Sequence, residues 1–353
     1  MPGQQNGDDS DERPLPRFSR PGRAWWLGAL VVIVAAVVTA LTRRAEFVNA
    51  SRLIARVDVA RLAVAIGFEA ASLVGLAAME RWLLRAGQAA ARLRLMVALT
   101  VAANAVAGVL PGGAAFSSAW YYRQLRRRGV AQVLAAAVLV VAGALSVISL
   151  FTLLLAGAVA AGSSGPGASL RPVMLALAGL LLVGTALMAG SSRFRPARRA
   201  AWRLWRRIGV RSRHAWSVED ALARLVRQAR SVEPGVRPWL QPYGLALLNW
   251  LCDAACLAAC LWALGIGVPW RGLLVAYALT QVGGSLRLTP GSLGIVEASL
   301  TALLVLYGLR GEQAIAATLL YRILSYWALQ PIGWACWFGL TLRGARPWMG
   351  NTP

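Results

Sequence analysis

The chain has 353 residues, of which 58% are hydrophobic, and its 37 basic residues against 14 acidic ones give a formal net charge of +23 at pH 7. The apolar residues form several runs near the length that crosses a bilayer, so the sequence predicts a polytopic membrane protein. Every basic residue is an arginine, and the arginines cluster between apolar runs, as the positive-inside rule describes. The charge therefore does not indicate a soluble nucleic-acid-binding protein.

The N-terminal region predicts a tail and two spans. Residues 1–23 mix acidic and basic side chains with proline and glycine, which predicts a disordered cytoplasmic tail. The apolar run after Arg23 is long, begins with two tryptophans and has no clear small-residue cleavage site. We therefore expect a retained first span over 24–42 rather than a signal peptide. A second span is expected over 62–79, after an amphipathic basic connector.

The next apolar segment, residues 95–122, is interrupted by Pro-Gly-Gly at 111–113 and has arginine clusters on both flanks. A broken helix at membrane depth packs against protein or lines a wet cavity. Basic flanks on both sides predict a re-entrant helical hairpin that enters and leaves at the cytoplasmic face. Two full spans over 130–161 and 172–190 would complete an N-terminal membrane half at 24–190.

The segment 191–241 is predicted to be a basic amphipathic linker on the cytoplasmic side. Residues 193–237 hold thirteen arginines with interleaved tryptophans, which is typical of a helix lying on an anionic leaflet. Nucleic acid is the alternative ligand. We expect no nucleic-acid partner, because the flanking spans tether this segment at the membrane.

The C-terminal membrane half, residues 242–341, shows a similar order. Spans are predicted over 243–264 and 314–340, and the segment 273–309 between them is broken at Pro290. The loops that flank this segment are short and nearly neutral, so we expect them outside the cell. The second hairpin would then enter from the side opposite to the first.

The predicted fold is thus an all-α polytopic membrane protein with about six spanning helices and two Pro/Gly-broken, re-entrant helical hairpins in an inverted arrangement. Both termini, including the tail at 342–353, are expected on the cytoplasmic side of the cell membrane. Inverted repeats with interrupted helices recur among transporters, because half-helix ends can hold a charged group near the midplane. Two unrelated kinks are the alternative interpretation.

Four ionisable residues interrupt the C-terminal apolar runs, namely Asp253, Arg287, Glu297 and Arg322. Charges inside a membrane are costly and indicate a functional site by default. The two arginines match the geometry of phosphate oxygens. Glu297 would hold a cationic headgroup, take up a proton or neutralise an arginine. Alternatively, Asp253 with Arg322 and Arg287 with Glu297 are structural ion pairs.

The helix expected after Pro290 would add backbone N–H groups to the same anion site. Asn104 would face the cavity from the first broken segment, and Arg123 would lie at headgroup level or mark the topology. The predicted substrate-binding residues are Asn104, Pro111, Gly112, Arg123, Asp253, Arg287, Pro290, Gly291, Gly294, Glu297 and Arg322.

The sequence predicts neither a metal site nor catalytic residues, and it indicates no cofactor. Cys252, Cys256 and Cys260 recur every fourth position along a helix, and the only histidine, His214, is distant in the chain. We expect buried small hydrophobic residues rather than metal ligands. A Walker loop is also missing, so ATP is not expected to be the direct energy source.

Two motifs in the C-terminal half resemble a known family. Residues 288–298 (LTPGSLGIVEA), followed after one helix by 317–327 (ATLLYRILSYW), resemble the flippase-like family that includes the transmembrane region of lysylphosphatidylglycerol synthase. Residues 249–253 (NWLCD) fit the preceding helix of that family. In the N-terminal half, Asn104, LPGG at 110–113 and WYYRQLRRRG at 120–129 resemble the motif that precedes these two in the family.

The resemblance covers about residues 62–340, and one departure is that the family usually has glycine where Ser292 stands. Few residues follow Leu340, so the resemblance implies the lipid-handling part alone, without the synthase domain. In such proteins this part is expected to move a charged lipid between leaflets.

The function expected first is a non-enzymatic lipid translocase that handles an anionic phospholipid or a polyprenyl-phosphate-linked lipid. A second possibility is an accessory subunit that docks a partner synthase or glycosyltransferase through the basic linker. A third is a membrane-embedded enzyme that acts on a lipid-linked sugar. The sequence does not indicate an oligomeric state.

Overall fold

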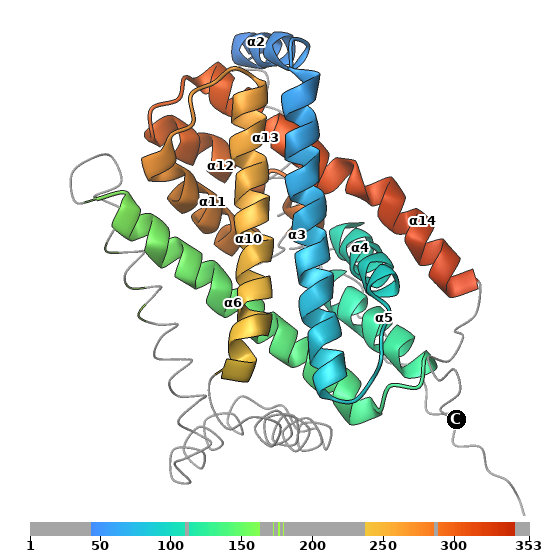
Figure 1. Ribbon diagram of the computed structural model, residues 1–353. Coiled ribbons are helices and arrows are strands. Elements are labelled where there is room, and N and C mark those ends of the chain that lie inside the picture. The colour runs from blue at the N-terminus through green and yellow to red at the C-terminus, as the bar shows by residue number, and fades with distance from the viewer. Residues whose placement is uncertain are drawn as a thin grey trace, which may run out of the picture. The chain divides into compact units, whose positions relative to one another are not determined.

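The computed structural model describes residues 44–109, 113–162, 237–285 and 289–342, with isolated positions at 172, 176 and 179. These residues form helices and contain no strand (Figure 1). The described part of the chain is therefore all-α, as predicted. The expected terminal tails, the first span, the span after residue 171 and most of the basic linker lie outside these ranges.

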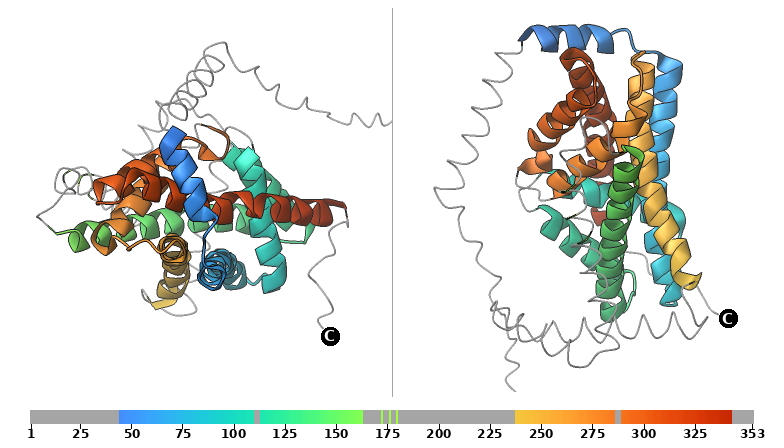
Figure 2. Two further views of the ribbon diagram at one scale, coloured as in Figure 1. Left: turned by 90° about the horizontal axis from the view of Figure 1, so that it is seen from above. Right: turned by 90° about the vertical axis from the view of Figure 1, so that its left-hand side faces the viewer.

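Two long helices lie side by side along one face of the fold, α3 (Val59–Ala86) and α10 (Arg237–Ala263) (Figures 1 and 2). Both are longer than the predicted spans at 62–79 and 243–264. Pro242 lies in the second turn of α10, so the helix begins within the segment that the sequence assigned to the linker. A proline in the second turn removes one intrahelical hydrogen bond, because its ring nitrogen carries no hydrogen.

The helices α3 and α10 run antiparallel. At one end the backbone N–H of Asp58, the N-cap of α3, donates to the carbonyl of Ala263 at 3.0 Å. At the other end the indole N–H of Trp82 donates to Gln241 Oε1 at 2.9 Å. The start of each helix therefore lies beside the end of the other.

The N-terminal broken pair consists of α4 (Leu93–Val109) and α5 (Gly113–Arg127), and α6 (Gln132–Ala160) follows it. The hydroxyl of Ser117 donates to the carbonyl of Ala103 at 2.7 Å, so α5 folds back along α4. The helix α5 extends beyond the predicted end of the hairpin at residue 122. Glutamine, leucine and arginine are good helix formers, and they continue the helix through the basic cluster.

The C-terminal broken pair consists of α11 (Trp270–Ser285), the 3₁₀ turn η2 (Pro290–Ser292) and α12 (Ile295–Leu306). The Ser292 hydroxyl donates to the carbonyl of Gly284 at 2.6 Å, which returns the chain against the end of α11. The break predicted at Pro290 is present.

A final long helical run consists of α13 (Gly311–Arg322), the π-helical segment η3 (Ile323–Trp327) and α14 (Leu329–Leu342). The sequence predicted one regular span here, because nothing in its apolar pattern marks a change of helical pitch. Single π turns within α-helices occur frequently at functional sites. The amphipathic connector predicted before the second span forms α2 (Arg44–Ile54), which packs on α13.

Each half thus consists of a long helix (α3 or α10), a broken pair (α4 and α5, or α11 and α12) and a second long helical run (α6, or α13 to α14). The halves exchange contacts, since α4 packs against α14, α11 packs against α6, and η2 reaches α4. Because each broken pair follows the end of α3 or α10, and these helices are antiparallel, the pairs open at opposite ends of the fold (Figure 1).

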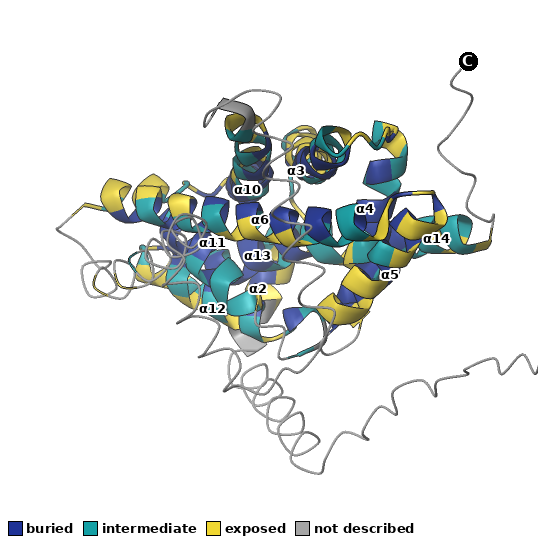
Figure 3. Cartoon of the chain, turned by 90° about the horizontal axis from the view of Figure 1, so that it is seen from below, coloured by how far each residue is buried: buried dark blue, intermediate teal, exposed yellow. Residues whose placement is uncertain are grey.

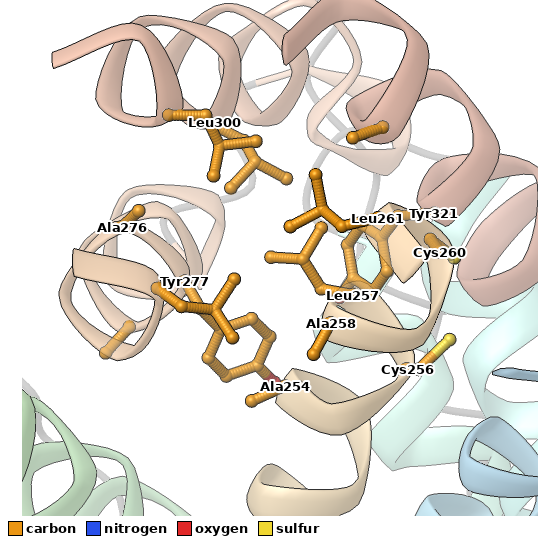
Figure 4. Close-up of a cluster of buried hydrophobic side chains, with 14 of the residues drawn as sticks. Ala254, Cys256, Leu257, Ala258, Cys260, Leu261, Ala276, Tyr277, Leu300 and Tyr321 are labelled. Atoms are coloured by element: carbon orange, nitrogen blue, oxygen red, sulfur yellow. The ribbon is translucent and has the colours of Figure 1, made fainter. Parts of the chain in front are cut away.

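Two apolar clusters surround the contact between the halves. The first joins Leu257 and Leu261 of α10 to Tyr277 of α11, Leu300 of α12 and Tyr321 of α13 (Figure 4). The second lies among α3, α4, α5 and α6. The outward side of α5 is broadly exposed (Figure 3).

Candidate functional site

A polar cavity of about 390 Å³ lies where the two halves meet. Its walls come from both long helices, both broken pairs and the run from α13 to α14. We call it the central cavity. Its polar and charged lining residues are Glu69, Ser72, Asn104, Ser146, Asn249, Asp253, Gln281, Ser285, Ser292, Tyr321, Arg322, Ser325, Tyr326 and Gln330.

One wall of the central cavity is organised around Asp253 of α10. Its Oδ2 accepts hydrogen bonds from the Tyr277 hydroxyl at 2.6 Å and from Gln281 Nε2 at 3.0 Å. Its Oδ1 accepts one from the Tyr321 hydroxyl at 2.8 Å. A carboxylate with three donors is stabilised in its charged form. The sequence alternative that paired Asp253 with Arg322 is wrong, because these neutral donors satisfy the aspartate.

Another part of the cavity wall contains Arg322, the last residue of α13. Its Nε donates to Glu297 Oε1 at 2.7 Å, and its Nη2 donates to the carbonyl of Gly291 at 2.9 Å. The guanidinium also lies over the ring of Tyr326, 4.5 Å from the ring centroid. Arg322 therefore has a carboxylate, a carbonyl and an aromatic face as partners, and it is 8% exposed. Of the described residues, it is the single cationic side chain that lines the central cavity.

The N-terminus of α12 differs from the predicted one in its start and in the partner of Gly294. The helix begins at Ile295, later than expected, and the Gly294 N–H donates to Glu297 Oε2 at 2.7 Å. Glu297 thus caps its own helix with one oxygen and binds Arg322 with the other. In this state the Gly294 N–H is occupied by a protein carboxylate, so it does not offer a site to a lipid phosphate.

The ends of the two broken pairs meet at Tyr326, in the π segment η3. Its hydroxyl donates to the carbonyl of Gly108, at the end of α4, at 2.8 Å. A Cβ atom added to Gly291, which has φ +60, would overlap the Tyr326 ring. A Cβ on Gly108 would come within 2.9 Å of the same ring. Both ends therefore need glycine to approach the tyrosine this closely.

The structure brings several predicted residues to the central cavity, namely Asn104, Asp253, Gly291 and Arg322. Glu297 adjoins the cavity through its ion pair with Arg322. Pro290 lies in the adjacent turn η2. Pro111, Gly112 and Arg287 lie outside the described residues.

Arg123 does not belong to this site. It is exposed on α5, where its Nε donates to the carbonyl of Ala119 in the same helix at 3.3 Å.

Four residues of the site were not among the predicted substrate-binding residues, namely Tyr277, Gln281, Tyr321 and Tyr326. The ring of Tyr321 is buried, and its hydroxyl donates a hydrogen bond to Asp253. The position of Asp253 in an apolar helix could have indicated these partners, because a buried aspartate requires hydrogen-bond donors from neighbouring helices. The four-residue spacing of Tyr277 and Gln281 places both on one face of α11.

The described residues contain no group of three or more histidine, cysteine or acidic side chains that could hold a metal ion. Cys252, Cys256 and Cys260 are buried, as predicted for small hydrophobic residues.

Long apolar helices around a polar, charged cavity define an integral membrane protein. Three of the described helices are long and apolar enough to cross a bilayer, at 59–86, 132–160 and 239–263. Residues 25–333 match the profile of the family described as the lysylphosphatidylglycerol synthase TM region. The chain belongs to this family, as the motifs at 288–298 and 317–327 predicted.

Two relatives in Methanothermobacter thermautotrophicus are described as UPF0104 membrane proteins. One is 30% identical over 89 residues, which cover 25% of this chain and 27% of the relative. The other is 33% identical over 89 residues, which cover 25% of each chain. The similarity thus spans about a quarter of the length of these relatives.

Proposed function

We propose that this protein moves an anionic phospholipid or a polyprenyl-phosphate-linked lipid between the leaflets of the cell membrane. The observation that carries the proposal is the central cavity, a polar space between two broken helix pairs in a membrane protein. Its volume of about 390 Å³ falls within the range typical of small-ligand sites, about 300–1,000 Å³. The headgroup would occupy this space while the acyl or prenyl chains stay in the bilayer.

The lengths of the helices support re-entrant hairpins. At a rise of about 1.5 Å per residue, α4 and α11 are each about 25 Å long and α12 about 18 Å, whereas α3 is about 42 Å long. The hydrocarbon core is about 30 Å thick. The broken helices are therefore short for a full crossing, and folding back would keep their ends close to the bilayer centre.

The opposite openings of the two pairs support alternating access. In many transporters, broken helices from inverted halves meet at the substrate site, and movement of one half against the other exposes it to either side. Here the ends of both pairs meet at Tyr326. Each pair would then control entry from one side of the membrane.

Arg322 is the residue expected to bind the lipid phosphate. Its guanidinium lines the cavity, and its present partner is the Glu297 carboxylate. A phosphate matches the same fork of N–H donors. We expect the headgroup to compete with Glu297 for this arginine, so that the ion pair is restored when the lipid leaves. The step changes no covalent bond, which is consistent with a transporter rather than an enzyme.

The test is leaflet exchange of a fluorescent anionic phospholipid and of a fluorescent polyprenyl-phosphate analogue in liposomes that hold the purified protein. Wild type is compared with Arg322→Gln and with Arg310→Gln. Arg310 is a matched control because it also pairs with a glutamate, Glu312, but has a side chain 72% exposed at a helix start.

We expect exchange in wild type and Arg310→Gln, and at least a tenfold loss in Arg322→Gln. Equal exchange in all three proteins would contradict a role of Arg322 in the translocation site. Absence of exchange of either lipid with folded wild type would contradict the proposed function and favour an accessory role.

A further inference from the structure

A second acidic residue lies beside Asp253 in the central cavity. Glu69 projects from α3, and its carboxyl group lies beside the carboxyl group of Asp253 and the thiol of Cys256, both on α10. The pair forms because α3 and α10 pack antiparallel and bring their middle turns together. Both carboxyl groups line the same polar space as Arg322.

The two carboxyl groups have unequal surroundings. Asp253 accepts three hydrogen bonds, from Tyr277, Gln281 and Tyr321. Glu69 is 8% exposed, and its Oε2 is buried without a hydrogen-bond donor among the described residues. Two buried carboxylates at close range cannot both remain ionised without strong repulsion, and they commonly share one proton. A proton on Glu69 would remove one of the two charges and would let Glu69 donate a hydrogen bond to Asp253.

No cation among the described residues neutralises this pair directly. The titratable side chains that face it are Cys252 and Cys256 of α10, Tyr277 of α11 and Tyr321 of α13. Arg322 lines another part of the cavity wall, where Glu297 already pairs with it. Cysteine and tyrosine are neutral near pH 7, so they do not balance two negative charges.

We propose that Glu69 and Asp253 form a proton-binding site that couples proton movement to lipid translocation. One proton from the water on one side binds a Glu69 oxygen and is shared with Asp253, so the pair carries one negative charge instead of two. When the cavity opens to the other side, water enters, the same proton leaves, and the dicarboxylate is restored. The coupling rests on the proposed function, whereas proton binding by the pair does not.

Infrared spectroscopy of the purified protein tests proton binding without any lipid transport. A protonated carboxyl group gives a separate C=O absorption that shifts in D₂O. We expect such a band near neutral pH, which weakens as the pH rises and is reduced in Glu69→Gln. Asp253→Asn should move the midpoint of this titration, and circular dichroism checks that both variants are folded.

Glu80→Gln is the matched control, because Glu80 is also a buried carboxyl of α3 but does not line the central cavity. Its Oε2 accepts hydrogen bonds from Thr100 and Tyr121. The control should keep the titrating band assigned to Glu69. If Glu69→Gln leaves the protonated-carboxyl absorption of the wild type unchanged, the proton site is refuted.

The coupling is tested in liposomes with a pH gradient across the membrane. For one proton per lipid, a gradient of one pH unit biases the leaflet distribution of the translocated lipid up to about tenfold. We expect wild type and Glu80→Gln to show this bias, and Glu69→Gln to lose it. A bias that persists in Glu69→Gln overturns the coupling. If wild type moves no lipid, the proposed function fails, and the infrared titration still decides whether the pair binds a proton.

Discussion

Tyr326 donates a hydrogen bond to the backbone carbonyl of Gly108 across 2.8 Å, although the two residues belong to opposite halves of the fold. The ring of the same tyrosine lies under the guanidinium of Arg322 and against Gly291. One side chain in a π-helical segment therefore joins the ends of both broken pairs and contacts the charged residue of the cavity. Separation of the halves at this point would break the bond to Gly108, whereas Arg322 and Gly291 lie in the same half as Tyr326.

Replacing Tyr326 by phenylalanine keeps the ring and removes the hydroxyl. The loss of a hydrogen bond of this kind costs about 1 kcal/mol, and here the bond holds the arrangement in which the ends meet. We expect Tyr326→Phe to lower the free energy of unfolding by about that amount. It should also accelerate lipid exchange in liposomes, because the closed arrangement, in which the ends of the two broken pairs meet, loses a contact. Denaturant unfolding followed by circular dichroism gives the first quantity.

Tyr307→Phe is the matched control for this substitution. The Tyr307 hydroxyl is buried at the end of α12 and has no hydrogen-bond partner among the described residues. Its removal should leave both stability and exchange unchanged or slightly raise stability. A Tyr326→Phe protein that behaves like Tyr307→Phe in both measurements would show that the bond to Gly108 does not hold the closed arrangement.

The ion pair of Glu297 and Arg322 should show strong energetic coupling. The side chains are 23% and 10% exposed, and loss of one partner leaves a poorly solvated charge. We expect Glu297→Gln and Arg322→Gln each to lower the free energy of unfolding by roughly 3 kcal/mol, and the double variant to lose clearly less than the sum. Chemical unfolding of the four proteins of this double-mutant cycle measures the coupling.

The exposed pair of Arg310 and Glu312 provides the comparison for the buried one. Its arginine side chain is 72% exposed, so solvent screens the interaction. The corresponding cycle with Arg310→Gln and Glu312→Gln should give a coupling of less than about 1 kcal/mol. Equal couplings for the two pairs would mean that the position beside the cavity adds nothing to the interaction of Glu297 with Arg322.

Much of this architecture could be predicted from the positions of prolines, glycines and long apolar runs. The chain is interrupted at Pro290 as predicted, and α4 and α5 are separate helices that end and begin on either side of residues 110–112. The partners of Arg322 could not be predicted in the same way. An arginine and an aspartate in neighbouring apolar helices suggest an ion pair, but the rotation of each helix decides which groups meet.

The role of Glu297 shows a similar limit. A later helix start, at Ile295, places its carboxylate over the first turn and in reach of the Gly294 N–H. The exact residue at which a helix begins is poorly determined by sequence. The contact between Glu69 and Asp253 likewise depends on the register of α3 against α10, which apolar periodicity alone does not fix.

Ser292 holds a backbone conformation that favours glycine. Its φ is +53, and its hydroxyl donates to the carbonyl of Gly284 at 2.6 Å. A left-handed conformation costs a residue with a side chain roughly 1–2 kcal/mol. Ser292→Ala keeps this strain and loses the hydrogen bond, so we expect a loss of about 1 kcal/mol in the free energy of unfolding. Ser292→Gly also loses the bond but relieves the strain, so its stability should stay close to that of wild type.

Chemical unfolding of Ser292→Ala and Ser292→Gly under the same condition tests whether the backbone at residue 292 is strained. We expect glycine to be more stable than alanine by about 1 kcal/mol or more, in line with the left-handed penalty. Equal stability of the two variants would show that the backbone at residue 292 is not strained.

Gly333 allows α14 of one half to approach α4 of the other. A Cβ atom at this position would lie 2.7 Å from the carbonyl oxygen of Val101 and would also overlap Ala105. Small residues at such positions let helix backbones approach closely within a membrane. Gly333→Ala should therefore push the helices apart and lower stability by roughly 1–3 kcal/mol, as overpacking does.

Gly339 is the matched control in the same helix, because a Cβ atom there would meet nothing within 4 Å. Gly339→Ala should leave stability unchanged or raise it by up to about 1 kcal/mol, since alanine is the better helix former. Denaturant unfolding in one detergent compares the two variants directly. A Gly333→Ala protein as stable as Gly339→Ala would mean that the contact between α4 and α14 is looser than the structure describes, and that the halves are not held together at this point.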